Sequence, residues 1–362
     1  MTHTANLTPF GMHTDFLGYN QAAKLVTRVG VIECLRGMTQ AIEHNFMRWQ
    51  DFTKSARIGN YSPDGVIELM PISDASDYAF KYVNGHPINT HRGLPTVMAF
   101  GALANMANGM PIFLSELTLT TALRTAATSV MAARQLMRPE SHCMALIGNG
   151  TQSEFQALAF HGVLGIDTLR IYDIDEMAMR KLHQNLAPYP IEVVCCSSTA
   201  EAVRGADIIT TITADNTNAI ILRADMVAPG THINAVGGDC PGKTELEASL
   251  LYKGNVFVEF EPQTRIEGEL QQMPADFAVT ELWQVLQKSS PGRLSPTQIT
   301  IFDSVGFALE DYSALRYMYA RAQEAGLLQP LELIPALQDP KNLFGLLHAQ
   351  APSSVISDRV TA

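Results

Sequence analysis

Hydrophobic and polar residues follow a regular alternation through the middle of the chain. Short apolar runs followed by amphipathic stretches predict strands that alternate with helices. The predicted strands are Ser141–Ile147, Leu169–Asp173, Ile191–Cys196, Asp207–Thr213, Thr231–Gly237, Val256–Phe260 and Ile299–Val305. The predicted helices between them are Ser153–Leu164, a helix capped by Asp175 that runs to about Leu186, and a short one opened by the capping box Ser198 to Glu201. This order predicts an α/β fold with a Rossmann-type, doubly wound parallel sheet.

The first 115 or so residues follow another pattern, with strands joined by short connections. These strands are predicted at Val66–Met70, Tyr78–Val83, Thr96–Gly101 and Met110–Leu114. The dipeptide Asn108-Gly109 predicts a two-residue hairpin turn between two of them. A meander of this kind belongs to an antiparallel or mixed sheet, so we expect a separate α+β domain.

Two long helices should join these regions. One, at about Thr118–Met137, would lead into the parallel sheet, and the other, at about Phe307–Ala325, follows its last strand. We expect the second helix to pack back on the first domain, which makes that domain discontinuous. The predicted division is therefore residues 1–137 with 307–362, and residues 138–306 as the nucleotide-binding domain.

Composition narrows the function further. The 362 residues are 46% hydrophobic and 17% charged, which is typical of a globular protein with a sizeable core. A net charge of −11 without a Lys/Arg-rich tract argues against nucleic-acid binding. We expect no secretory signal and no membrane span. Five cysteines without a C-x-x-C motif indicate a reduced, cytoplasmic protein, and the histidine spacings predict no metal site.

A nucleotide-binding signature follows the first strand of the alternating region. Gly148-Asn149-Gly150-Thr151-Gln152-Ser153 matches G-x-G-x-x-G with serine in the third position. Gly148 would make the tight turn, and Gly150 would let a pyrophosphate approach the backbone at the helix N-terminus. Asp173 ends the next strand and would bind the adenosine ribose, which favours NAD over NADP. Thr213, at another strand end, is a further expected contact of the cofactor.

One carboxylate stands where such sheets carry out chemistry. Asp239 follows the strand Thr231–Gly237 and two glycines, Gly237 and Gly238, which we expect to turn the backbone sharply and close to a ligand. Ligands of doubly wound sheets bind at this carboxyl edge. Asp239 is therefore the candidate general base beside the cofactor.

Charged residues in apolar surroundings predict the substrate. Lys81 lies in a mostly apolar strand, Arg57 follows a loop, and Arg124 lies in the long helix. A buried cation needs an anion, which for any one of the three could be an ordinary salt-bridge partner. Glu68, in the apolar strand Val66–Met70, could bind a cationic end of a substrate. Cations and acids beside a nicotinamide suggest an amino acid oxidised at Cα, whose α-nitrogen must first lose a proton to a base.

Several segments resemble the ornithine cyclodeaminase/μ-crystallin family, and the similarity spans nearly the whole chain. The similar segments are Lys54–Arg57, Val66–Pro71, Tyr78–Pro87, Thr121–Ala127, Met144–Phe160, Val236–Leu246, Glu259–Gly268 and Phe302–Asp311. The resemblance implies that Arg57, Lys81 and Arg124 serve the substrate carboxylate and nearby cofactor groups, that Val305 contacts the substrate, and that Asp239 is the catalytic acid/base. It implies a role for Glu68 at the distal amine. The implied NAD contacts are Thr96, Arg124, Gly148, Gly150, Thr151, Gln152, Asp173, Thr213, Val236, Gly237, Lys243, Ser304 and Lys341.

The implied reaction converts L-ornithine, or a similar basic amino acid, to a cyclic imino acid with loss of ammonia. NAD would take hydride from Cα, the distal amine would attack the resulting imine, and the same NADH would reduce the ring to L-proline. The family fold also implies a homodimer built through the sheet of the first domain, which would then bind substrate and dimerise.

Three other functions remain open from the sequence. The first is an NAD(P)-dependent cyclic imine reductase or amino-acid dehydrogenase on the same fold, and the second is a lysine cyclodeaminase. The third is a non-catalytic ligand-binding protein like the crystallins. Retention of Asp239, Lys81 and Arg57 argues against the third, and the segment Gly238–Lys243 favours a cyclodeaminase over the first.

Overall fold

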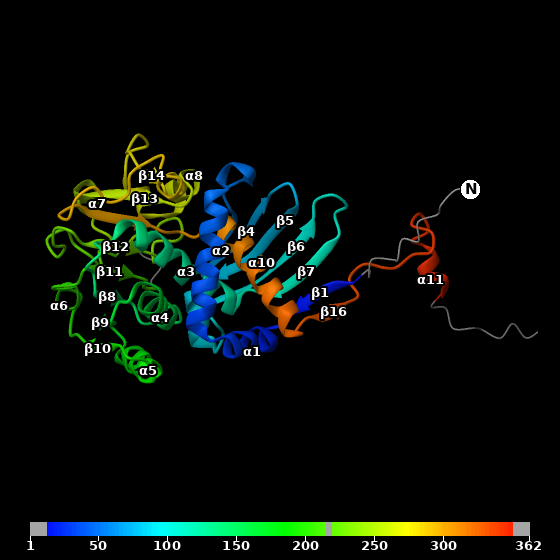
Figure 1. Ribbon diagram of the computed structural model, residues 1–362, viewed down its shortest axis with the longest axis horizontal. Helices are drawn as coiled ribbons and strands as arrows, with labels where there is room; N and C mark the ends of the chain where they lie inside the picture. The colour runs from blue at the N-terminus through cyan, green and yellow to red at the C-terminus, as the bar shows by residue number, and fades with distance from the viewer. Residues whose placement is uncertain (1–12, 215–218, 350–362) are drawn as a thin grey trace, which may run out of the picture.

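The computed structural model describes residues 13–214 and 219–349. Within these residues the strands form two eight-stranded sheets. Figure 1 shows one sheet at each end of the body with long helices between them. The first sheet is formed by the N-terminal part of the chain together with β16 (Gln329–Leu331), and the second is formed by the alternating region.

The second sheet is parallel throughout, and its strands run in the order β10-β9-β8-β11-β12-β15-β13-β14. Its strands are β8 (Cys143–Ile147), β9 (Thr168–Tyr172), β10 (Glu192–Cys195), β11 (Ile208–Thr211), β12 (His232–Ala235), β13 (Gly254–Val258), β14 (Thr280–Glu281) and β15 (Ile299–Asp303). The predicted doubly wound sheet is confirmed. The chain order reverses at β8, which pairs with β9 and β11, so a crevice opens beyond the carboxyl ends of these strands.

Helices connect these strands and begin largely where their capping residues predict. They are α4 (Ser153–Leu164), α5 (Glu176–Leu186), α6 (Thr199–Val203), α7 (Ala248–Lys253), α8 (Glu261–Glu267) and α9 (Leu282–Leu286), with a 3-10 turn η3 (Glu269–Gln272). The Asp175 side chain accepts the N–H of Met177, and the Ser198 side chain accepts the N–H of Glu201. Helix α4 has the predicted bounds and ends at Gly165, whose φ is +76°.

The first sheet is mixed, in the order β16-β1-β7-β6-β5-β4-β2 with β3 paired to β4. Its strands are β1 (Thr14–Leu17), β2 (Thr53–Lys54), β3 (Ile58–Ser62), β4 (Gly65–Ser73), β5 (Asp77–Gly85), β6 (Val97–Asn105), β7 (Pro111–Glu116) and β16 (Gln329–Leu331). The two-residue turn predicted at Asn108-Gly109 is wrong. Asn105 donates its N–H to Met110, which leaves a four-residue loop between them, and the Asn108 side chain accepts the N–H of Met110.

Long helices fill the space between the sheets. They are α1 (Tyr19–Val29), α2 (Val31–Met47), α3 (Thr118–Leu136) and α10 (Ala308–Ala325). Helix α3 is buried on almost every side because its many Ala, Ser and Thr residues allow close packing, and it contacts β6 of one sheet and β12 and β15 of the other. Helix α10 follows the second sheet in sequence but contacts β4, β5 and β6 of the first (Figure 1).

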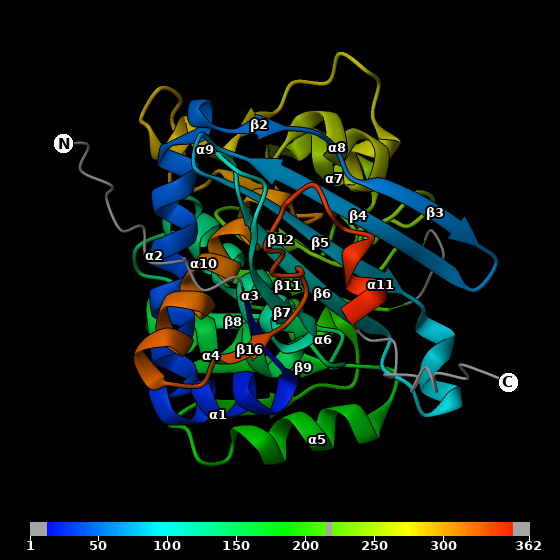
Figure 2. The same ribbon diagram turned by 90° about the vertical axis from the view of Figure 1, so that its right-hand side faces the viewer.

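One face of the mixed sheet is covered by α10, and the opposite face is apolar and exposed. Along β4 the buried residues alternate with Ile67 and Leu69, which are 40% and 39% exposed, and Phe100 of β6 is 44% exposed. Figure 2 views this side, where β4 and β5 lie next to each other. Contiguous exposed apolar faces of this kind are typical of protein, membrane or ligand contact surfaces.

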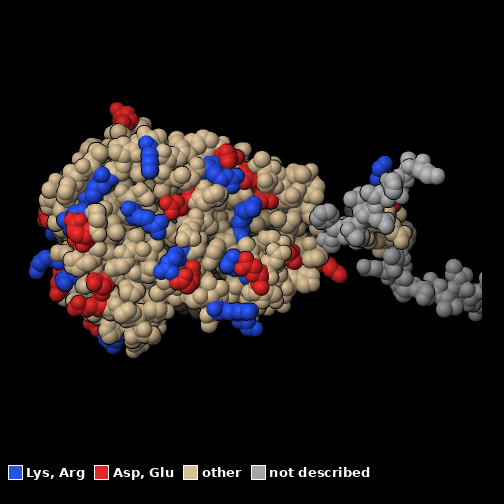
Figure 3. Space-filling view, in the orientation of Figure 1, with Lys and Arg blue, Asp and Glu red and all other residues tan. Residues whose placement is uncertain are grey.

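Beyond β16 the chain forms an arm that carries α11 (Gly345–Ala349) away from both sheets (Figure 1). On the face in Figure 3, basic and acidic side chains are interspersed over the body. None of the helices in the described residues combines the length and the apolar character of a membrane span.

Candidate active site

The turn after β8 is shaped for a dinucleotide. Gly148 has a φ of +95°, and a methyl group there would lie 2.7 Å from the carbonyl oxygen of Ile212, so glycine is needed for the turn itself. A methyl group at Gly150 would meet no atom within 4 Å. It would instead fill the space where a pyrophosphate approaches the backbone in this fold. The buried Ser153 donates its hydroxyl to the Gly150 carbonyl and so closes the turn.

Two side chains tie this turn to its surroundings. Asp173 follows β9 and accepts the N–H groups of Asn149 and Asp175, at 2.5 and 2.9 Å. Its carboxylate thus lies beside the Gly148–Gly150 turn, where a ribose recognition role requires it. Gln152 donates to the carbonyl of Ala122 in α3 at 2.9 Å. The turn is therefore fixed to the helix that also carries Arg124, whereas Thr151 is exposed.

Arg57 is the most heavily paired cation of the site. Its Nη1 donates to Glu68 at 2.8 Å, and its Nε lies 3.0 Å from Glu267. Its Nη2 donates to the carbonyl oxygens of Val305 and Gly306, which follow β15. These contacts join the mixed sheet to the carboxyl edge of the parallel sheet. Three of the five N–H groups of the guanidinium are thus hydrogen-bonded, and Nε is ion-paired with Glu267. These contacts leave the second N–H of Nη1 for another acceptor.

Carboxylates outnumber cations at this position. Glu68 and Glu267 both pair with Arg57, and the charge of Asp239 also acts on Arg57 and on Glu267. Burial raises the pKa of Glu267 to about 7, with Arg57 opposing the shift and Glu68 and Asp239 adding to it. These three acids face two cations, Arg57 and the Lys243 that pairs with Asp239, so one negative charge remains when Glu267 is ionised. This charge suits a ligand that carries an ammonium group.

Lys81 and Arg124 form the second cationic group. Lys81 donates to Asp311 at 2.8 Å, while Arg124 pairs with Glu310 at 2.7 Å and with Asp311 at 3.0 Å. All four side chains are buried. Burial and the neighbouring Arg124 lower the pKa of Lys81 to about 8, and burial raises the pKa of Glu310. Lys81 and Arg124 are thus paired as in ordinary salt bridges. They also lie close enough to Arg57 for its charge to act on both, so the three cations share one region.

The segment after β15 is held by a carboxylate that the sequence did not single out. Glu259 accepts the Ser304 hydroxyl at 2.6 Å and the N–H groups of Val305 and Gly306 at 3.4 and 3.2 Å. Gly306 has a φ of +77°, and a methyl group there would lie 2.6 Å from Nη1 of Arg124. The predicted contact residues Ser304 and Val305 therefore lie in the same turn that packs on Arg124.

Asp239 lies where the sequence predicts, beyond the carboxyl end of β12. Its carboxylate is 53% exposed, and the Nζ of Lys243, which is 7% exposed, donates to it at 3.1 Å. Lys243 therefore contacts the predicted base directly. The pairing orients the Asp239 carboxylate and leaves it open to a ligand.

The two glycines before Asp239 have a different purpose from the predicted one. Neither Gly237 nor Gly238 has a positive φ, so a sharp backbone turn is not what requires them. A methyl group at Gly237 would lie 2.1 Å from Oε1 of Glu245, and one at Gly238 would lie 2.8 Å from Oε1 of Glu269. Buried carboxyl groups occupy the space that a side chain would need.

Thr213 also contacts Glu245, to which it donates both its N–H, at 2.8 Å, and its hydroxyl. Thr96 is half-buried just before β6, and its carbonyl oxygen accepts the N–H of His86. Lys341 is exposed on the arm between β16 and α11, and this arm extends from the side away from the parallel sheet (Figure 1). One chain does not bring Lys341 to the nucleotide turn.

The sequence analysis missed several acids that hold the site, namely Glu245, Glu259, Glu267, Glu269, Asp303, Glu310 and Asp311. All are buried, and each pairs with a cation or with backbone N–H groups. Acids in apolar stretches such as Ile299–Asp303 were the available signal, because a carboxylate in a buried strand needs a partner.

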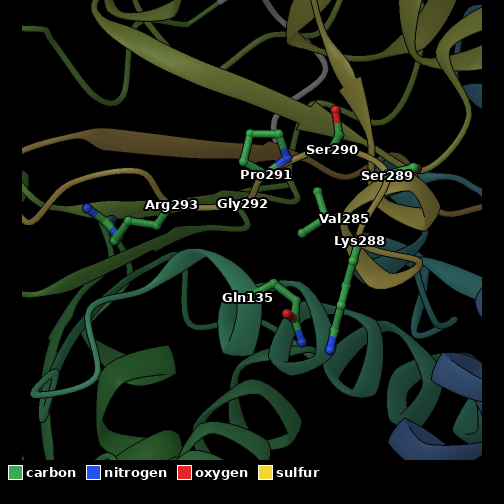
Figure 4. Close-up of a pocket in the computed structure, with 8 residues that line it drawn as sticks. All are labelled: Gln135, Val285, Lys288, Ser289, Ser290, Pro291, Gly292 and Arg293. Carbon is green, nitrogen blue, oxygen red and sulfur yellow. The ribbon is translucent and has the colours of Figure 1, made fainter.

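Figure 4 shows a hollow in a different region, between the end of α3 and the loop after α9. It is lined by Gln135, Val285, Lys288, Ser289, Ser290, Pro291, Gly292 and Arg293. Arg293 donates to the carbonyl oxygens of Leu136 and Thr231, which precede strands of the parallel sheet. The hollow therefore lies at the amino ends of the strands, opposite the carboxyl edge that carries the residues above.

Comparison with known proteins identifies the fold and the cofactor class. A lysine cyclodeaminase structure, described as recognising L-lysine, L-ornithine and L-2,4-diaminobutyric acid, is 30% identical with a TM-score of 0.85, covering 91% of this chain and 99% of that one. An archaeal alanine dehydrogenase dimer with bound NAD is 28% identical with a TM-score of 0.82, covering 89% and 100%. The residues around Gly148 and Gly150 fit the same cofactor.

Sequence relatives are more specific. An ornithine cyclodeaminase from Brucella suis biovar 1 (strain 1330) is 54% identical over 332 residues, covering 92% of this chain and 93% of that protein. The model of the ornithine cyclodeaminase/mu-crystallin family matches residues 20–326. The expected resemblance is thereby confirmed, and the chain belongs to the ornithine cyclodeaminase/mu-crystallin family.

Proposed function

We propose that this protein converts L-ornithine to L-proline and ammonia, with NAD as a cofactor that is regenerated in each turnover. The observation that carries the proposal is the excess of carboxylates around Arg57. Glu68, Glu267 and Asp239 face two cations, Arg57 and Lys243, so with Glu267 ionised the region attracts a substrate with an additional ammonium group. Ornithine carries two ammonium groups and one carboxylate.

Lys81, Arg124 and the remaining N–H of Arg57 would bind the α-carboxylate of the substrate. Their own acids, Glu310 and Asp311, reduce the cost of burying these cations when no substrate is present. Val305 would pack against the substrate from the turn that Arg57 holds. At the other end of the substrate, Glu68 and Glu267 would bind the distal ammonium group.

The cofactor would lie across the carboxyl edge of the parallel sheet, and bound NAD supplies the acceptor and donor of the Cα hydride. Residues 138–306 would form its domain, and residues 1–137 with 307–362 would bind the substrate. Support comes from the open space at Gly150 and from Asp173 beside the turn. The proposed contacts are Thr96, Arg124, Gly148, Gly150, Thr151, Gln152, Asp173, Thr213, Val236, Gly237, Lys243 and Ser304.

Asp239 would act as the acid/base. Its exposed carboxylate can accept a proton from the α-ammonium group, which must be neutral before Cα is oxidised. Lys243 donates to this carboxylate and orients it. Glu267, whose pKa burial raises to about 7, can take a proton from the distal ammonium near neutral pH. The neutral distal amine then attacks Cα within the same molecule, and ammonia leaves.

Two observations favour ornithine over the other functions. By sequence alignment the ornithine cyclodeaminase relative is 54% identical, compared with 31% for an L-lysine cyclodeaminase and 33% for an alanine dehydrogenase. Glu68 and Glu267 also give the site a negative charge that a dehydrogenase of a neutral amino acid does not need. Lys341 remains a predicted cofactor contact that one chain does not bring to the site.

The open face of the mixed sheet supports a homodimer. Ile67, Leu69 and Phe100 would be covered by the same face of a second copy, since exposed apolar surface of this kind is costly in water. The outer faces of β4, β5 and β6 are thus the proposed interface.

The experiment combines the purified chain, L-ornithine and an amount of NAD far below that of the substrate. We expect proline and ammonia in equal amounts, many turnovers per NAD, and no build-up of NADH. L-norvaline, which lacks the distal amine, is the matched control and should yield no proline. NADH accumulation in proportion to ornithine consumed would instead identify a dehydrogenase.

A further inference from the structure

Three buried acids behind the site are arranged as a ladder, and the proposed reaction uses none of them. Asp303, at the end of β15, accepts the N–H of Glu269 at 2.9 Å and that of Leu270 at 3.0 Å. Glu269 in turn accepts the N–H of Glu245 at 2.7 Å and that of Leu246 at 3.1 Å. Each acid therefore fixes the backbone of the next one.

The third acid connects this ladder to the site. Glu245 accepts the N–H and the hydroxyl of Thr213, the residue just beyond β11 that is proposed to contact NAD. Its carboxyl group also fills the space at Gly237, two residues before Asp239. One side chain thus touches both the cofactor side and the acid/base side of the crevice.

Glycines accompany all three acids. Methyl groups at Gly268, Gly238 and Gly237 would lie 2.6, 2.8 and 2.1 Å from carboxyl oxygens of Asp303, Glu269 and Glu245 respectively. A residue with a side chain at any of these positions would displace the carboxyl group beside it. The pairing of each acid with a glycine indicates that the ladder has a defined geometry.

Simple explanations do not account for this arrangement. The three side chains are 0 to 1% exposed, so they do not serve solubility. In residues 13–214 and 219–349, no cluster of His, Cys, Asp and Glu is arranged to hold a metal ion. Burial raises the pKa of all three acids, that of Asp303 to about 8, so their burial costs stability. Buried apolar residues would fill the space at less cost.

We propose that Glu245, supported by Glu269 and Asp303, is a positioning residue that fixes the distance between Thr213 and the Gly237–Asp239 turn. The NAD ring must meet Cα of the substrate while the Asp239 carboxylate meets the nitrogen bound to that carbon, so a small displacement of either strand end slows the reaction. The inference rests on the proposed function, because that function places NAD beside Thr213 and the substrate beside Asp239.

The test is a double-mutant cycle with Gly237→Ala and Glu245→Asp. The methyl group of Gly237→Ala displaces the Glu245 carboxyl, and the Asp side chain, about 1.5 Å shorter, withdraws it from the same space. We expect each single variant to weaken NAD binding and lower kcat at least tenfold. We expect the double variant to be no worse than the poorer single variant, because the shorter acid makes room for the methyl group.

NAD affinity by calorimetry, kcat and KM for ornithine, and the melting temperature are measured for every variant. A merely structural role would lower the melting temperature and leave the NAD affinity of the folded protein unchanged. Losses that multiply in the double variant, or wild-type NAD affinity in Glu245→Asp, would overturn the proposal. Glu247→Asp, the same change in the N-cap residue of α7, whose carboxyl group accepts the N–H of Ala224, is the matched control.

Glu245→Gln is the second test, for the case in which Glu245→Asp does not fold. The amide oxygen of glutamine can still accept both groups of Thr213, so we expect NAD affinity within threefold of wild type. A tenfold or larger loss would show that the charge acts rather than the position. Because NAD affinity is read without ornithine, failure of this inference is distinguishable from failure of the proposed reaction.

Discussion

Replacing Gly150 by alanine separates cofactor binding from stability. A methyl group there meets no atom within 4 Å, and the φ of Gly150 is not positive, so the folded protein can accept alanine. The free energy of unfolding should stay the same or rise by about 0.4 to 1 kcal/mol, because alanine restricts the unfolded chain. The methyl group should nevertheless keep the pyrophosphate from the backbone N–H groups.

The expected loss of affinity follows from these hydrogen bonds. A hydrogen bond to a charged group contributes about 1.5 to 3 kcal/mol, and about 1.4 kcal/mol corresponds to a tenfold change in affinity. Gly150→Ala should therefore weaken NAD binding by roughly one to two orders of magnitude, as titration calorimetry would measure.

Gly148→Ala is the matched control, because its main expected effect is on the free energy of unfolding. Its φ of +95° and the 2.7 Å approach to the Ile212 carbonyl predict a loss of roughly 2 to 5 kcal/mol in the free energy of unfolding. Chemical denaturation of the two variants without NAD should show this difference. Wild-type NAD affinity in Gly150→Ala would refute the placement of the pyrophosphate over this turn.

Three further predictions concern charge. Asp173→Ala should weaken binding of NAD and relax discrimination against NADP, as the ratio of the two dissociation constants would show; an unchanged ratio would contradict ribose recognition by Asp173. Asp239→Asn should bind NAD normally and lose turnover by about 100-fold or more, and near-normal turnover would remove its acid/base role. Burial raises the pKa of Asp303 to about 8 and that of Glu267 to about 7. Between about pH 4 and pH 8 the folded state therefore binds protons that the unfolded state has released. The free energy of unfolding should fall as pH rises through this range. Asp303→Asn should reduce this slope by at most about 1.4 kcal/mol per pH unit in denaturation curves, and a slope that stays the same would contradict the assignment.

Local signals predicted the parallel sheet and the place of the site. Helix α4 has the predicted bounds because Gly165 ends it with a left-handed residue and the nucleotide turn precedes it. Asp173 and Asp239 could be placed because both follow buried strands, and parallel strands bring their carboxyl ends to one edge. In the mixed sheet, β1, β2, β3 and β16 were missed. β1 and β16 are short and are formed only by pairing with strands far along the chain. β2 has only two residues, and β3 is exposed over most of its length, so neither has a clear pattern of buried positions.

The charge pairs could not be predicted in the same way. Lys81 pairs with Asp311, 230 residues away, and Arg124 pairs with Glu310, 186 residues away. Nothing in a local pattern connects residues at such separations. Helix α10 brings both acids to the mixed sheet from beyond the parallel sheet, so its return across the molecule decides these contacts.

The sequence correctly indicated that position 237 needs glycine, but for the wrong physical reason. A glycine pair after a strand suggests a sharp turn, but the structure shows ordinary φ values and a carboxyl group where the side chain would be. The fold brings the Glu245 carboxyl group next to Gly237, and no local sequence pattern predicts this contact.

The central claim is that hydride leaves Cα of ornithine and returns to the same carbon in the product. The most direct measurement uses L-ornithine carrying deuterium at Cα, together with unlabelled NAD, and follows the label by mass spectrometry. The account predicts L-proline with deuterium retained at Cα and no label in the free nucleotide pool. Unlabelled proline together with deuterium in free NADH would contradict it.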